Sequence, residues 1–251
     1  MATKRNIRVQ GAGLSGWGRS LSPPWFDGVA PAAAYAFGRK ATQEHGAEIL
    51  GRRHLNLLFR GSGRPDDLGY VAGNAASAVV PMSGVELKTR TGGFTLITVN
   101  TAALNVSHNA ISNLRNSGGS GVTLQQDDSN TTSLFVQTNA NGLGGASTGA
   151  LPERGQAIMN VGIVAGTVAK AGLFKPGGDG PFVFNQNLPG AFDGGSAFLV
   201  IGSSPNAGDF GSAVSARHYF DLFYDFALTN AQLLDVYRWC AAELAKDGVA
   251  F

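Results

Sequence analysis

The sequence is short of charge and of cysteine. Charged residues make up 14% of the 251 positions, well below the roughly one quarter that is usual in soluble proteins. The formal net charge is only +2, which gives no electrostatic reason to expect nucleic acid as a partner. The single cysteine, Cys240, excludes a disulfide within the chain. Its place on the apolar side of the last predicted helix indicates a small buried side chain.

Long apolar runs are absent too. No stretch approaches the roughly twenty apolar residues of a membrane-spanning helix, so no membrane insertion is expected. Lys4, Arg5 and Arg8 are not followed by an apolar run, so no secretory signal is expected either.

Glycine, by contrast, is abundant, at 36 of 251 residues, about twice its average use. Hydrophobic residues at 43% are enough for a core, and the length suits one large β-domain with or without an extension. Gly together with many Asn, Ser and Thr is typical of a β-protein rich in turns and argues against a helical bundle.

Short β-rich runs separated by turn residues follow one another from Phe94 to the end. This spacing predicts an all-β sandwich or jelly roll. The predicted strands are Phe94–Asn100, Val122–Gln126, Ser133–Thr138, Ala157–Ala165, Phe182–Asn185, Ala197–Ile201 and His218–Phe226. We place a boundary at residue 75, with an N-terminal arm and extension over 1–75 and the sandwich with its C-terminal helix over 76–251.

The N-terminal part has a different amino-acid composition. Residues 1–30 are rich in Gly, Ser and Pro and carry the isolated aromatic residues Trp17, Trp25 and Phe26, which predicts an irregular arm that anchors onto a neighbour. Residues 31–53 have moderate helical character interrupted by glycine, and an extra sheet edge is an equal alternative. A strand is possible over 54–59.

The C-terminal part combines a strand with a capped helix. In His218–Phe226, alternation places His218 and Phe220 on the more apolar face and Tyr219 and Asp221 on the other. Thr229 and Gln232 then form a capping box, and Leu228 and Leu233 occupy the positions of a hydrophobic staple. Apolar residues follow at helical spacing, and Gly248 stands just past the predicted end.

This C-terminal pattern resembles the closing signature of laminin-G-like and concanavalin A-like jelly-roll domains. The matching residues are Asp221, Tyr224, Asp225, Ala227, Leu228, Thr229 and Gln232. The match is close over the last thirty-odd residues and looser back to about Phe94. The resemblance implies an all-β jelly-roll sandwich with a C-terminal helix. Such domains are usually extracellular modules, and a phage particle is a fitting home for one without a signal peptide or disulfides.

A Gly-x-Gly-x-x-Gly motif at Gly11, Gly13 and Gly16 suggests a dinucleotide site, but its context does not. The mechanism needs the third glycine to open a helix that holds the pyrophosphate. Here Gly16 is followed by Gly18 and then Pro23-Pro24. We therefore interpret the motif as part of the arm.

Catalytic patterns are weak throughout. The Glu-x-Asp-x-(x)-Glu arrangement of jelly-roll glycoside hydrolases is missing. Asp221 and Asp225 stand roughly 13 Å apart by strand rise, too far for either hydrolytic geometry. We expect Asp221 to be a hydrogen-bonded structural carboxylate and Asp225 to form the turn before the helix. The chain is expected not to be an enzyme.

The sequence offers candidate residues for two kinds of binding site. Asp127, Asp128 and Asn130 offer hard oxygens for Ca²⁺ in one turn, although a tight hairpin selects the same residues. Carbohydrate binding needs an aromatic platform beside amides and carboxylates, and loops at the end of a sandwich commonly carry function. The candidate glycan residues are Asn185, Asn187, Phe192, Asp193, Asn206, Asp209 and Phe210.

Together these features predict a non-catalytic structural protein of a phage particle, a capsid decoration or tail component at the virion surface that is assembled in the host cytoplasm. Its expected partners are other virion proteins, further copies of itself and host surface glycans. A free or surface-attached carbohydrate-binding module is the alternative, and a glycoside hydrolase is a weaker third.

Overall fold

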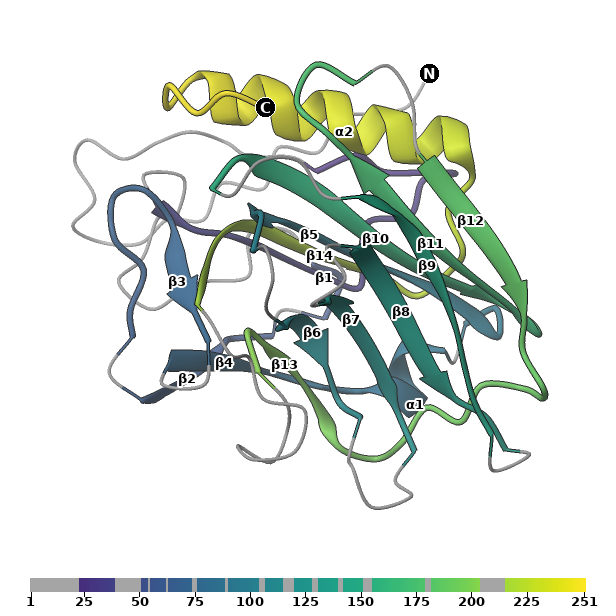
Figure 1. The fold of residues 1–251 in the computed structure, drawn as a ribbon. Coiled ribbons are helices and arrows are strands. Elements are labelled where there is room, and N and C mark those ends of the chain that lie inside the picture. Colours follow the sequence, from purple (N-terminus) through teal and green to yellow (C-terminus); the bar gives the residue numbers. More distant parts are fainter. Residues whose placement is uncertain are drawn as a thin grey trace.

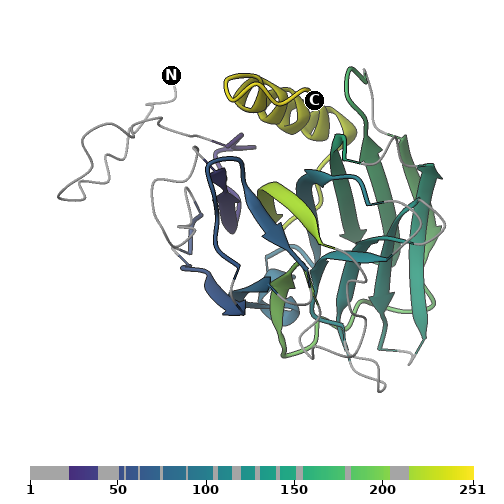
Figure 2. The same cartoon turned by 60° about the vertical axis from the view of Figure 1, so that its left-hand side comes forward.

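The chain folds into two antiparallel β-sheets with a helix on one outer face. The computed structural model describes residues 23–38, 51–53, 55–61, 63–73, 76–88, 90–103, 107–114, 120–127, 131–139, 142–150, 155–178, 182–203 and 215–251. Figures 1 and 2 show the sheets stacked face to face, with α2 (Asn230–Ala245) as a third layer. The all-β sandwich with a C-terminal helix predicted from the sequence is confirmed.

Within the described ranges each sheet has seven strands, and every strand pairing is antiparallel. The main order in the first sheet is β1 (Ala33–Ala36), β14 (Ala216–Tyr224), β5 (Gly93–Thr101), β10 (Ala157–Ala165), β11 (Val168–Phe174) and β12 (Phe182–Asn187). The short strand β3 (Tyr70–Ala72) belongs to the same sheet and pairs with β14. The order in the second sheet is β2 (Leu58–Gly61), β4 (Ala76–Ser83), β13 (Phe198–Ile201), β6 (His108–Ser112), β7 (Val122–Gln126), β8 (Thr131–Gln137) and β9 (Leu143–Ala150).

Two large hydrophobic cores among the described residues hold these layers together. One lies between the sheets and includes Phe94, Leu124, Leu134 and Phe223. The other lies between the outer face of the first sheet and α2, where Val236 and other helix residues pack on the strands. Alternating side chains on β5, β10 and β14 serve both cores, because successive residues of a strand point to opposite faces.

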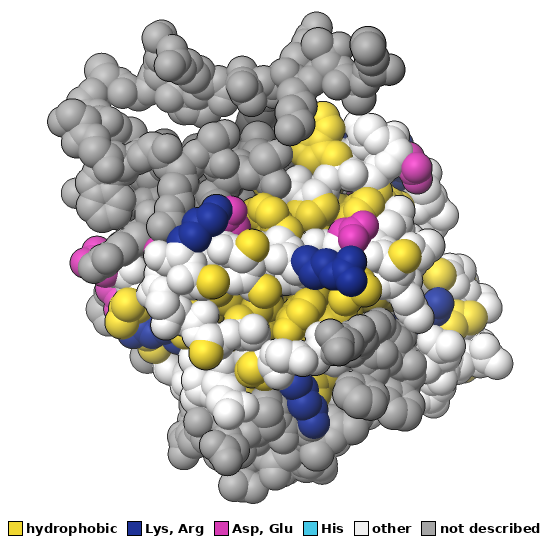
Figure 3. Space-filling view, turned by 90° about the horizontal axis from the view of Figure 1, so that it is seen from above, with side chains coloured by type: hydrophobic (Ala, Val, Ile, Leu, Met, Phe, Trp, Pro, Cys, Tyr) yellow, Lys and Arg dark blue, Asp and Glu magenta, His cyan; other side chains and the backbone are white. Residues whose placement is uncertain are grey.

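Helix α2 begins and ends where the sequence predicts. The Thr229 side chain accepts a hydrogen bond from the backbone of Gln232, and the Gln232 side chain accepts one from the backbone of Thr229, which completes the capping box. Leu228 and Leu233 are buried, and Gly248 has a left-handed φ of 71° just past the helix. Figure 3 looks onto the α2 side, where positive and negative side chains lie next to each other among hydrophobic and uncharged ones.

A β-bulge in β14 changes the predicted assignment of faces. The register shifts between His218 and Phe220, with His218 opposite Asn100 and Phe220 opposite Val99. Strict alternation put His218 on the face of Phe220, and this is wrong. Because Tyr219 is the extra residue, His218 joins Asp221 between the sheets, while Tyr219 and Phe220 both pack in the core under α2.

The predicted boundary at residue 75 is also corrected by the structure. Strands β1, β2 and β3 precede it and pair with β14 and β4, so the sandwich includes residues before 76. For residues 33–36, the sheet-edge alternative is the one observed. The alanine-rich sequence has helical propensity, but pairing with Phe220–Phe223 of β14 decides the conformation.

A one-turn helix, α1 (Gly84–Leu87), follows β4 and has a capping box of its own between Ser83 and Glu86. No helix within the described ranges is long and apolar enough to cross a membrane.

Replacing Leu233 of α2 by Ala is expected to lower the free energy of unfolding by about 2–5 kcal/mol, because it leaves a cavity under a fully buried side chain. Urea unfolding followed by circular dichroism measures the loss. Leu234→Ala is the matched control, since Leu234 is only partly buried, and its loss should be smaller. Equal losses would contradict the packing of α2 described above.

Candidate functional site

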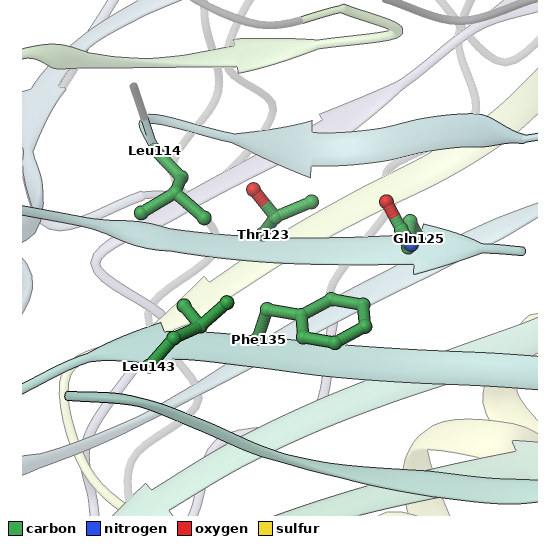
Figure 4. Close-up of a pocket in the computed structure, with 5 residues that line it drawn as sticks. All are labelled: Leu114, Thr123, Gln125, Phe135 and Leu143. Atoms are coloured by element: carbon green, nitrogen blue, oxygen red, sulfur yellow. The ribbon is translucent and has the colours of Figure 1, made fainter. Parts of the chain in front are cut away.

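A shallow depression of about 120 Å³ lies on the outer face of the second sheet. Its lining residues come from β7, β8 and the ends of neighbouring segments: Leu114, Thr123, Gln125, Phe135 and Leu143. Figure 4 shows the ring of Phe135 beside Leu143, with Thr123 and Gln125 on the adjacent strand. The inward side of the same strands carries Leu124 and Leu134, so alternation sends Thr123, Gln125 and Phe135 outward.

Strand register fixes the geometry of this depression. Thr123 lies opposite Phe135, and Phe135 lies opposite Gly145, which contributes no side chain over the ring. The Thr123 hydroxyl is engaged with the Ser112 hydroxyl at 2.6 Å. The Gln125 side chain is therefore the polar group of the lining that can meet a ligand, beside an aromatic ring and the 54% exposed Leu143.

The chemistry of this lining suits an uncharged ligand with one apolar side. A phenyl ring offers a flat apolar surface, and the Gln125 amide can both donate and accept hydrogen bonds. All five lining residues are uncharged. The pyranose ring of a sugar combines a C–H face with hydroxyl groups around its edge and matches both elements.

Asp127 comes directly after β7 and holds the β7–β8 hairpin. Its Oδ2 accepts hydrogen bonds from the Thr131 hydroxyl at 2.7 Å and the Ser133 hydroxyl at 2.5 Å, and its Oδ1 accepts one from the Thr131 backbone N–H at 3.0 Å. These are the bonds by which a turn aspartate stabilises a hairpin. Asp128 and Asn130, the other predicted calcium ligands, lie outside the described residues. Among the residues that are described, no group of three or more His, Cys, Asp or Glu is placed to hold a metal ion.

The predicted glycan residues do not form one platform in the structure. Asn185 and Asn187 are exposed on β12, where they pair with Lys170 and Val168 in the first sheet. Phe192 is buried against Phe94, with its carbonyl accepting a hydrogen bond from Lys88 Nζ.

The remaining predicted glycan residues are either hydrogen-bonded within a turn or outside the described residues. The carboxylate of Asp193 accepts hydrogen bonds from the Ser120 hydroxyl at 2.5 Å and from the Gly195 N–H. Asn206, Asp209 and Phe210 fall outside the described residues. The prediction that Phe192 belongs to a glycan platform is wrong. Its ring is buried against Phe94 in the core and cannot face a sugar.

Of the three aromatic residues predicted to anchor the arm, one lies outside the described residues, one is exposed and one is buried. Trp17 is outside the described residues, and Trp25 is 49% exposed. Phe26 is buried and packs on Tyr224 with ring centroids 5.9 Å apart. The Tyr224 hydroxyl donates to the Pro24 carbonyl at 3.1 Å, so the chain from Pro24 onward is fastened to the sandwich.

A second polar constellation lies between the sheets. His218 Nδ1 is 3.1 Å from Asp221 Oδ2 and 3.2 Å from the Thr98 hydroxyl, and His218 Nε2 is 3.1 Å from His108 Nε2 of the opposite sheet. All four side chains are fully buried. Burial raises the pKa of the Asp221 carboxyl, while His218 opposes this shift.

Asp221 and Asp225 thus have the structural roles predicted for them. Asp221 is hydrogen-bonded inside the sandwich. Asp225 directly follows β14 and forms an ion pair with Arg52, whose Nε also donates to the Ala30 carbonyl. Neither carboxylate faces the depression.

Sequence reasoning missed Phe135 and Gln125 as site residues. The predicted strand Ser133–Thr138 contains the signal, because alternation with the buried Leu134 and Val136 turns Phe135 outward. An aromatic side chain on the solvent-facing side of a strand is unusual and indicates a surface site.

No protein-family model matches the chain, and no curated protein sequence matches it. Solved structures do share the fold. The binding domain of botulinum neurotoxin DC in complex with SialylT aligns with a TM-score of 0.62 at 6% identity, over 84% of this chain and 51% of that one. A Trypanosoma rangeli sialidase in complex with a difluorinated keto-deoxy-nononic acid aligns with a TM-score of 0.57 at 14% identity, over 93% of this chain and 37% of that one.

A botulinum neurotoxin type C structure, described with cell entry that depends on two ganglioside molecules, has a TM-score of 0.61 at 7% identity over 84% of this chain and 51% of that one. The chain thus spans about half the length of the toxin chains it matches. At these identities the similarity establishes the β-sandwich fold and nothing finer.

Replacing Asp127 by Ala is expected to lower the free energy of unfolding by about 1–3 kcal/mol, because the hairpin hydroxyls lose their acceptor. Urea unfolding measures this loss in buffer with calcium and in buffer with EDTA. Asp67→Ala, in an exposed turn, is the control and should stay within about 0.5 kcal/mol of the wild type. A loss confined to calcium-containing buffer would contradict the hairpin role and support a metal site.

Proposed function

We propose that the chain is a non-catalytic glycan-binding β-sandwich, and that it binds a sugar in the depression around Phe135. One observation carries the proposal: a phenyl ring and a side-chain amide lie together on the outer face of the second sheet. A stacking surface beside one amide is the minimal arrangement for holding a pyranose ring with a defined orientation.

The structural neighbours support this choice of ligand class. The toxin domains that share the fold are described with SialylT and with gangliosides, and the sialidase with a nononic acid derivative. Those ligands belong to those proteins. For this chain, the uncharged lining favours a neutral sugar face over an acidic group.

Binding without cleavage is the favoured form of this activity. Hydrolysis of a glycoside needs two carboxyl groups on either side of the scissile bond. Of the carboxylates considered above, Asp221 and Asp225 are engaged inside the molecule, and Asp127 is engaged by the hairpin hydroxyls. The release of reducing sugar by purified protein would count against a purely binding role.

A glycan array probed with the purified chain, followed by calorimetry on the best hit, tests the proposal. Phe135→Ala is expected to weaken binding roughly two- to tenfold, the worth of an aromatic stacking contact. Phe198→Ala is the matched control, since Phe198 is 49% exposed and does not line the depression. No binding to any glycan, or equal losses in the two variants, would reject the site.

We propose further that the sandwich is displayed on a phage particle, assembled with other virion proteins and with copies of itself. Weak single-site binding would then be amplified by the number of copies. The support is the aromatic arm before the sandwich, with Trp25 exposed beside the anchored Phe26. A free carbohydrate-binding module is the alternative.

Removal of residues 2–22 together with Trp25→Ala separates these two settings, because it takes away Trp17 and the exposed Trp25. This deletion spares Pro24 and Phe26, which pack on Tyr224, so the truncated chain should keep its thermal stability and its glycan binding. Light scattering is expected to find that the full chain assembles and that the truncated chain is monomeric. Identical association states would favour the free module, and loss of glycan binding in a folded truncated chain would contradict the placement of the site.

A further inference from the structure

The accessible surface around Phe135 continues beyond the depression, along two neighbouring strands. The outward residues of β8 and β9 alternate with core residues such as Leu134 and Ala146. We call the accessible outward ones the β8–β9 strip: Phe135, Gln137, Leu143, Gly145 and Ser147. All five are uncharged. Leu143 and Ser147 are four residues apart on one strand, so the strip is about 13 Å long and exceeds the length of one pyranose ring.

The strip is bounded on one side and open on the other. On the side of β6, the neighbouring Ser112 and Leu114 are buried, which leaves little surface for a ligand to cover in that direction. On the other side, β9 is the last strand of the second sheet in the described ranges, and Gly145 places no side chain beside the Phe135 ring. A ligand on this ring therefore lies along the strands and not across them.

At one end of the strip, hydrogen bonds that start at Asp127 orient the Ser147 hydroxyl. An ionised carboxylate can only accept, so the Ser133 hydroxyl donates to Asp127 Oδ2 at 2.5 Å. Ser133 has no second hydroxyl proton, so Ser147 is the donor in the bond of 2.8 Å between their oxygens. The proton of Ser147 is thus used inside the molecule. Its oxygen presents lone pairs to solvent and can accept from a ligand hydroxyl.

Two side-chain amides lie on either side of the Phe135 ring along the strands. Gln125 of β7 is in the same cross-strand row as Ser147, and Gln137 is two residues beyond Phe135 on β8. Within the described part of the chain, Gln125 makes no side-chain hydrogen bond, and Gln137 makes a long one of 3.5 Å to the next backbone carbonyl. Since an amide donates and accepts, both can pair with hydroxyls of sugars next to the one on the ring.

We propose that the β8–β9 strip binds a linear, neutral oligosaccharide along the strands, with one sugar on Phe135 and a further sugar on each side. The inference rests on the proposed function and extends it from a single sugar to a chain of three. One flanking sugar donates a hydroxyl to Ser147 and pairs with Gln125, and the other pairs with Gln137. An acidic group at the Ser147 end would meet oxygen lone pairs near the Asp127 carboxylate, which disfavours charged sugars there.

Calorimetry on the full chain tests the length of the ligand. The probes are linear oligomers of glucose, mannose, galactose and N-acetylglucosamine, each with one to five units. At least one series is expected to bind, with an affinity that rises roughly tenfold from one unit to three, since each flanking sugar adds a hydrogen bond. Beyond three units the affinity should level off. An affinity that does not change with length in any bound series would overturn the proposal.

Ser147→Ala and Gln137→Ala shorten the strip at its two ends. Both side chains lie outside the hydrophobic cores, so these variants should fold, and thermal melting checks that they do. Each is expected to reduce the gain in affinity from one unit to three by roughly two- to tenfold, the loss of one hydrogen bond. Phe198→Ala, accessible and away from the strip, is the control and should keep the full gain. Full gains in both strip variants would contradict the assignment.

The outcomes separate this inference from the proposed function. Weaker binding in Phe135→Ala, combined with equal affinities for one unit and for three, would keep the glycan site and reject the strip. Binding that Phe135→Ala leaves unchanged, or no binding to any glycan, would reject the site and the strip together. Tighter binding of acidic than of neutral oligomers of the same length would also reject the strip as a neutral site.

Discussion

The structure depends on the extra residue in strand β14. This strand lies between β1 and β5 in the first sheet and has a core on each face. The bulge at Tyr219 places two successive aromatic residues, Tyr219 and Phe220, under α2. It also turns His218 inward, onto the side of Asp221. Without the bulge, the same sequence would direct an imidazole into the helix interface and leave Asp221 buried without its partner.

The interior between the sheets is divided into an apolar and a polar part. Aliphatic and aromatic side chains fill the first. In the second, Asn100 Oδ1 accepts hydrogen bonds from Gln126 at 3.0 Å and from Asn160 at 2.7 Å, and Asn160 in turn accepts from Thr132. Apolar contacts tolerate sliding, whereas hydrogen bonds between buried side chains require one arrangement. The network therefore sets how the two sheets are placed against each other.

Local patterns in the sequence were sufficient for much of this architecture. The seven predicted strands and the capped helix are all present, since alternation, turn residues and a capping box act over a few residues. The conformation of Ala33–Ala36 and the bulge at Tyr219 could not be predicted, because distant strands impose both. At the candidate site, the turn-rich segment drew attention to Phe192, which proved to be core, while Phe135 was hidden in a strand.

The place of β14 also bears on how the chain reaches its fold. It follows every other strand in the sequence, yet it is the partner of β1, β3 and β5. Contacts so distant along the chain close slowly, because the loop entropy is lost before the pairing is gained. During synthesis, β1 and β3 must therefore wait for almost the whole polypeptide before they can pair. In that interval their edges are open to pairing with other chains.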